Sequence, residues 1–184
     1  TQKGSLVNPN YLRFDFSHFA KIDNEEIKKI EQTVNAKILA NIPLEEHNNL
    51  PLSKAEDLGA IMLFGEKYED VVRMIQFDNS KELCGGTHVN ATGEIGLFKI
   101  ISEASISSGI RRIEALTGKL ALAYLSNENE IISQLKQNFN CEEENLLDKI
   151  NETEKNIKKN IDSIQEININ EIKTKINNLT KENM

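Results

Sequence analysis

Apolar and polar residues alternate in short, distinct stretches along the first part of the chain, which predicts a mixture of strands and helices. Residues 12–16 alternate strictly and predict a half-buried strand. Asp23, with Glu26 three positions later, has the form of a capping box and predicts the start of a helix. The helix is predicted to end before Pro43, and it carries apolar residues at helical spacing: Ile27, Ile30, Val34 and Ile38.

Shorter elements follow this helix. A second, short helix is predicted over residues 51–58, ended by Gly59, and a strand over Val71–Phe77. Two further strands, over residues 97–101 and 110–116, are separated by the small-residue run 105–109. From Thr117 onward the apolar spacing is helical.

The last part of the chain, roughly residues 142–184, carries a short heptad pattern. Its apolar residues take alternating three- and four-residue steps, interrupted by Glu154, and they shift phase after residues 167–170. The in-phase stretch is shorter than the three to four heptads that identify a coiled coil. We therefore predict a solvated helical hairpin, and keep an oligomerising coiled coil as the alternative.

Glycine and proline divide the chain into two parts. All nine glycines and all three prolines precede residue 120, so the remainder contains no residue that breaks a helix. We predict a mixed domain over residues 1–125 and a helical segment over residues 126–184. The fold class is α+β: a mixed β-sheet with helices packed on one face and Cys84 and His88 near its edge, followed by a helical, alternatively coiled-coil, tail.

Composition excludes several classes of protein. The net charge of −7 argues against a surface that binds nucleic acid without sequence preference, since phosphate binding needs clustered Lys and Arg. No apolar stretch is long enough for a membrane-spanning helix, and no signal peptide is recognisable. Two cysteines make no disulfide scaffold, so a cytoplasmic location is expected. The chain starts at Thr1 in what reads as the middle of a sequence, and we expect it to be a fragment of a larger protein.

The segment Cys84-Gly85-Gly86-Thr87-His88 carries the most chemical information. A thiolate and an imidazole four positions apart can face the same side of a turn, and both are ligands that zinc prefers. The two glycines between them let the backbone fold tightly and let another molecule approach. The alternative is a buried structural cysteine next to an unrelated histidine.

The other candidate metal ligands are interpreted as non-ligands. His18 follows the predicted strand at 12–16 and is expected to be a strand-end residue, and His47 lies in a polar stretch and is expected to be solvent-exposed. Cys141 lies in the helical part with no ligand partner near it in sequence. Zinc needs four ligands, or three and a water, so any further ligands are expected from sequence outside this chain.

A pair of arginines, Arg111-Arg112, opens the last predicted strand. In an acidic chain such a pair is a candidate for binding a phosphate or a carboxylate. The alternative is one arginine in a surface ion pair and the other in solvent.

Six blocks of the sequence together resemble the editing domain of the alanyl-tRNA synthetase family, in that family's order and spacing. The resemblance covers about residues 1–125, and residues 126–184 are similar to the start of the helical segment that follows the editing domain. The blocks are QKGSLV (2–7), LRFDFSHF (12–19), AIMLFGEKY (60–68), ELCGGTHV (82–89), TGEIGLF (92–98) and GIRRIEALTG (109–118).

The resemblance implies roles for individual residues. Cys84 and His88 would be zinc ligands, with two further histidine ligands on a His-x-x-x-His helix expected upstream of Thr1. Gln2 matches a glutamine of the family's editing pocket, Arg111 matches an arginine near it, and Thr87 lies within the pocket motif. Without the upstream helix, we expect the isolated chain to bind zinc weakly or not at all and to be inactive.

The resemblance also implies a function. The parent protein would attach alanine to tRNA(Ala) with ATP, and this part would hydrolyse mischarged Ser-tRNA(Ala) and Gly-tRNA(Ala), with the tRNA acceptor end as its partner. Such a second site is needed because an alanine pocket cannot exclude glycine by size and rejects serine only weakly. The alternatives are a freestanding hydrolase of mischarged tRNA and a non-catalytic assembly module that forms homo-oligomers through its C-terminal helices.

Overall fold

The computed structural model describes residues 1–62 and 67–182, with side chains described as far as residue 176. The middle of the sequence block 60–68 therefore lies outside the described residues. The chain divides into two compact units, Thr1–Leu125 and Ser126–Met184.

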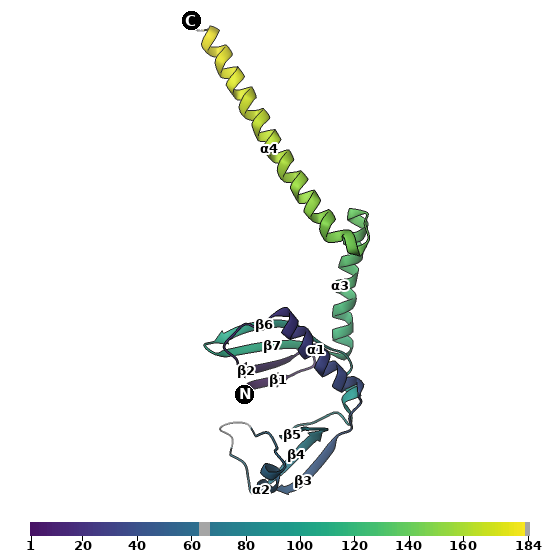
Figure 1. The fold of residues 1–184 in the computed structure, drawn as a ribbon. Coiled ribbons are helices and arrows are strands. Elements are labelled where there is room, and N and C mark those ends of the chain that lie inside the picture. The colour runs from purple at the N-terminus through teal and green to yellow at the C-terminus, as the bar shows by residue number, and fades with distance from the viewer. Residues whose placement is uncertain (63–66, 183–184) are drawn as a thin grey trace. The chain divides into compact units, whose positions relative to one another are not determined.

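A four-stranded antiparallel sheet forms one half of the first unit (Figure 1). Its strands lie in the order β1 (Gln2–Val7), β2 (Leu12–Ser17), β7 (Ile110–Thr117) and β6 (Phe98–Ser107). Helix α1 (Asn24–Leu39) contacts β6 and the short 3-10 helix η1 (Thr92–Ile95). The core between helix and sheet consists of Ile22, Ile100, Ile113 and Ala115.

Helix α1 begins as the sequence predicts. The Asp23 carboxylate accepts a hydrogen bond from the Glu26 N–H at 2.8 Å, and the Glu26 carboxylate accepts one from the Asp23 N–H at 3.1 Å, which completes the capping box. The Asn35 side chain then joins α1 to β6, because it donates to the Phe98 carbonyl and accepts from the Phe98 N–H, both at 2.9 Å.

A three-stranded antiparallel sheet forms the other half of the first unit, in the order β3, β4, β5. It packs with helix α2 around a second core of Ala55, Met74 and Leu83. The predicted short helix and the predicted strand over Val71–Phe77 are confirmed. The bounds are β3 (Glu45–Pro51), α2 (Leu52–Asp57), β4 (Val71–Phe77) and β5 (Ser80–Leu83).

The α+β class is confirmed, with the strands distributed over two antiparallel sheets. The sequence pattern did not predict β1, β3 or β5, because none of them shows a regular alternation of apolar and polar residues. Each of these strands lies at the edge of its sheet. Strand β6 also extends to Ser107, past the predicted residue 101, since its small polar residues remain paired with β7.

The remainder of the chain is helical, as predicted. Helix α3 (Gly118–Phe139) is followed by α4 (Glu143–Glu182), which is one uninterrupted helix. The prediction of a hairpin within residues 142–184 is therefore wrong: the phase shift at 167–170 changes which face is apolar but contains no glycine or proline to end the helix. Within the described residues, no helix combines the length and apolar character needed to cross a membrane.

Candidate functional site around Cys84

Cys84 lies directly after the last strand of the three-stranded sheet. Leu83 pairs with Met74 in the second core, and the Cys84 N–H donates to the Arg73 carbonyl at 3.3 Å. Cys84 therefore directly follows a core residue and is the first residue beyond β5. Its side chain is half-buried, and the alternative of a sealed structural cysteine is not supported.

The turn after Cys84 folds back on the sulfur. The Gly86 N–H donates a hydrogen bond to Cys84 Sγ at 3.4 Å, which brings the backbone two residues later against the sulfur. A side chain at Gly85 would meet nothing within 4 Å, so the turn is open on that side. Thr87 and His88, which complete the motif, are exposed.

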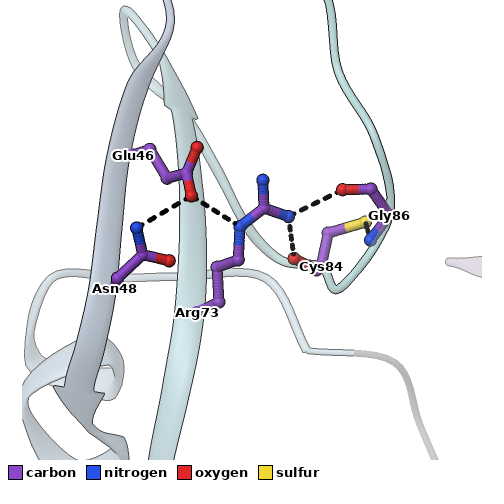
Figure 2. Close-up of polar contacts among 5 residues, drawn as sticks. All are labelled: Glu46, Asn48, Arg73, Cys84 and Gly86. Carbon is purple, nitrogen blue, oxygen red and sulfur yellow. Dashed lines mark hydrogen bonds and ion pairs between the residues drawn. The ribbon is translucent and has the colours of Figure 1, made fainter.

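Hydrogen bonds from Arg73 of β4 connect this turn to the sheet (Figure 2). Its Nη1 donates to the Cys84 carbonyl at 2.8 Å and to the Gly86 carbonyl at 2.7 Å. Its Nε donates to Glu46 Oε1 on β3 at 3.0 Å. The guanidinium therefore joins both ends of the turn to the neighbouring strand.

Glu46 is held in its charged form. The hydrogen bond from Arg73 lowers the pKa of Glu46 most, the hydrogen bond from Asn48 at 2.8 Å lowers it further, and the charges of Arg73 and His88 add smaller effects. In return, the hydrogen bond to Glu46 raises the pKa of Arg73. The pair is therefore fully ionised at neutral pH.

The donors at this turn fit part of a zinc site. Cys84 supplies a reachable thiol and His88 an exposed imidazole, in the motif spacing described above. Among the described residues, no group of three or more His, Cys, Asp or Glu side chains is placed to hold a metal ion. A four-ligand zinc site at this turn therefore needs further ligands. A hollow of about 290 Å³ adjoins the turn, lined in part by Arg73, Cys84 and Gly85.

Gln2 and Arg111 belong to the other sheet. Both pair with Phe16, Gln2 from β1 and Arg111 from β7, so they lie in one row across the four-stranded sheet. The Gln2 side-chain amide donates to Ser5 Oγ at 3.3 Å, and its carbonyl oxygen accepts no hydrogen bond from the residues that the structure describes. The predicted site residues therefore form two groups, one on each sheet.

Both arginines of the Arg111-Arg112 pair form ion pairs with carboxylates of the same sheet. Arg111 donates through Nε and Nη2 to the Glu103 carboxylate, and Arg112 does the same to Asp15 at 2.7 and 2.8 Å. They are consecutive strand residues and so face opposite sides. The alternative that one of them lies free in solvent is wrong, and a contact of Arg111 with substrate stays a prediction.

The predictions for the two other histidines, His18 and His47, have different outcomes. His18 is an exposed residue just after β2, as expected of a strand end. The expectation that His47 is solvent-exposed is wrong: it lies in β3 opposite Met74 and is half-buried, and its Nε2 atom is buried with no hydrogen-bond partner among the described residues. The strand was not predicted because the sequence around His47 is polar. Strand β3 forms through its backbone pairing with β4.

Sequence reasoning missed Arg73 and Glu46. Arg73 offered a signal, since it is the one charged residue in the otherwise apolar and neutral strand Val71–Phe77. A charge in such a strand has to find a partner. Glu46 offered no such signal in the sequence, because its position beside Arg73 depends on the pairing of β3 with β4.

Comparison with known proteins identifies a family that this chain resembles. Residues 72–114 match the model of the threonyl and alanyl tRNA synthetase second additional domain, a range that includes Arg73, Cys84, His88 and Arg111. The chain is similar to alanine–tRNA ligases of Bacteroides fragilis (60% identity over 139 residues, 76% of this chain), Flavobacterium psychrophilum (46% over 181 residues, 98%) and Methylobacillus flagellatus (48% over 157 residues, 85%). It spans between 16% and 19% of the length of these three relatives.

Proposed function

Because this chain belongs to the alanine–tRNA ligase family, of which it spans one segment, we propose that it is the part that hydrolyses wrongly charged tRNA. Its substrates are Ser-tRNA(Ala) and Gly-tRNA(Ala), bound through the acceptor end, and it acts in the cytoplasm as part of an ATP-dependent ligase. That the similar proteins are several times longer supports a domain of a ligase over a freestanding hydrolase.

The observation that carries the proposal is the ordered turn at Cys84. The thiol is reachable, its sulfur accepts the Gly86 N–H, and the backbone on both sides is fixed by Arg73. A turn fixed in this way suits a metal ligand, because it loses little conformational freedom when the metal binds.

Cys84 and His88 are the residues that would hold zinc, together with two histidines from sequence upstream of Thr1. When bound, zinc supplies a polarised water and a charge that orients the ester. These roles agree with the donor types present, a thiol and an imidazole.

Gln2 and Thr87 are the residues proposed to recognise serine. With its amide nitrogen engaged by Ser5, Gln2 keeps a carbonyl oxygen that can accept a hydrogen bond from a serine hydroxyl. The exposed Thr87 hydroxyl can do the same. Alanine offers no hydroxyl, so these contacts favour binding of the wrong amino acid.

The test is hydrolysis of Ser-tRNA(Ala) by the full-length ligase that contains this chain. We expect Cys84→Ala to slow single-turnover hydrolysis by about a hundredfold or more, since a lost ligand costs at least as much as a lost supporting residue. Cys141→Ala is the matched control, because Cys141 lies in the helical unit, and it is expected to hydrolyse at the wild-type rate.

Attachment of alanine to tRNA is measured alongside, and we expect both variants to retain it. Equal hydrolysis by wild type and Cys84→Ala would remove Cys84 from the mechanism and refute the proposal.

A further inference from the structure

Three residues form a row across one face of the three-stranded sheet. Glu46 is paired with Ile75, and Arg73 lies two positions before Ile75 on the same face of β4. Cys84 adjoins Arg73 from the other side, one position beyond the last pair of β4 and β5. The order Glu46, Arg73, Cys84 therefore follows from strand register, and Figure 2 shows it as a continuous chain of hydrogen bonds.

A β-bulge supports the outer end of this row. The register of β3 shifts between His47 and Leu50, and Asn49 takes a positive φ of 56°. Within the bulge, the Asn48 side chain donates to Glu46 Oε1, the same oxygen that accepts from Arg73 Nε. Glu46 is thus held from both sides.

The inner end of the row depends on the shape of the guanidinium. One nitrogen, Nη1, satisfies two carbonyls two residues apart, while Nε satisfies Glu46. These directions are fixed by a rigid planar group, which a lysine ammonium on a flexible stem does not reproduce.

The same turn also brings a backbone N–H to the sulfur. With the Cys84 and Gly86 carbonyls turned toward Arg73, the Gly86 N–H points to Cys84 Sγ. Without the guanidinium, both carbonyls lose their partner inside the protein and the turn is free to adopt other conformations. The Arg73 side chain is 27% exposed, and two of its three nitrogens are engaged, so it is poorly placed to bind a substrate phosphate instead.

We propose that Arg73, held by Glu46, is a positioning residue that fixes the turn at Cys84 in the conformation that binds zinc. Arg73 does not touch the metal and acts through the backbone of Cys84 and Gly86. This inference rests on the proposed function, because it assumes that Cys84 is a zinc ligand.

Zinc affinity of the full-length ligase tests the inference, measured for zinc alone by competition with a chromogenic chelator. We expect Arg73→Lys, which keeps the charge, to weaken zinc binding by about ten- to a hundredfold, as loss of a residue that supports a metal ligand typically does. Arg112→Lys is the matched control: it alters an arginine–carboxylate pair on the other sheet, and zinc affinity is expected to stay within twofold of wild type.

A second readout needs no metal. In the zinc-free protein, the Gly86 amide is expected to exchange its hydrogen faster in Arg73→Lys than in wild type. Should Arg73→Lys fail to fold, Glu46→Gln serves in its place, because it removes only the charge that holds Arg73, and it is expected to weaken zinc binding in the same direction.

The outcomes separate the two proposals. If Cys84→Ala loses zinc while Arg73→Lys and Glu46→Gln bind it as wild type does, Arg73 is not a positioning residue and the proposed function stands. If Cys84→Ala binds zinc as tightly as wild type, the proposed function itself fails. An unchanged exchange rate at Gly86 in Arg73→Lys also overturns the inference.

Discussion

Replacing Met74 with alanine tests how the sheet behind Cys84 is held together. Met74 is 0% exposed and is the largest completely buried side chain among the described residues. It lies in the core with Ala55 and Leu83, and it is the strand neighbour of Arg73. A cavity at this position should therefore loosen the sheet that carries the Cys84 turn.

The size of the effect follows from the atoms removed. The substitution deletes three heavy atoms beyond Cβ, and burial is worth about 0.8 kcal/mol for each methylene-sized group, or roughly 2.4 kcal/mol in all. The cavity left behind adds to this loss, and fully buried Met→Ala substitutions cost about 2–5 kcal/mol. We expect about 3 kcal/mol at Met74, since no part of the side chain is in contact with water.

Amide hydrogen exchange measures this loss where it occurs. In β4 and β5, about 3 kcal/mol corresponds to exchange that is faster by roughly a hundredfold, at 1.4 kcal/mol for each factor of ten. Amides of β2 and β7 serve as an internal reference, because their sheet packs around a different core. Met74→Leu keeps the volume and is expected to cost less than about 1.5 kcal/mol.

Two results would refute this reasoning. Acceleration below about fivefold in β4 and β5 would mean that Met74 contributes little to the core. Equal acceleration in Met74→Leu and Met74→Ala would mean that shape, and not the lost volume, controls the sheet.

The remaining predictions concern the other sheet and its glycines. Hydrogen bonds from Arg112 and Arg111 lower the pKa values of Asp15 and Glu103, so their stabilising effect is complete above the ordinary values of 3.8 and 4.5 and is lost as the pH falls below them. The urea midpoint should therefore fall more steeply between pH 5 and pH 3 in wild type than in Asp15→Asn combined with Glu103→Gln, and parallel curves would contradict this. Gly96→Ala should destabilise the protein in thermal melts more than Gly59→Ala: both positions have a positive φ, which costs about 1 kcal/mol, but only at Gly96 would the new Cβ lie 2.9 Å from the Gly118 backbone. Equal losses would show that the close approach of Gly96 to Gly118 is unimportant.

Elements with a strong local signal were predictable from the sequence. The capping box of Asp23 and Glu26 determines where α1 begins, because both hydrogen bonds lie within four residues. The alternation at 12–16 and the apolar run over Val71–Phe77 likewise identify β2 and β4. The candidate site was recognised through the Cys84 motif, but its roles in metal binding and hydrolysis stay predictions.

Elements that depend on partners were not predictable. Strand β3 has a polar sequence and exists because β4 supplies its hydrogen bonds, so His47 was assigned to the surface in error. The pairing of Arg111 with Glu103 joins two strands of a hairpin and depends on a register that contains two irregularities. Such a register is decided by the whole sheet, and no short window of sequence contains it.

The amino-acid sequence alone determined where α1 begins and where β2 and β4 form, and it placed a thiol and an imidazole on either side of flexible glycines. Both are local properties, because capping, periodicity and ligand spacing act between residues a few positions apart. The tertiary structure alone decided that Glu46 and Arg73 lie beside Cys84, since Glu46 and Arg73 are 27 positions apart in the chain and only the pairing of β3 with β4 brings these two together.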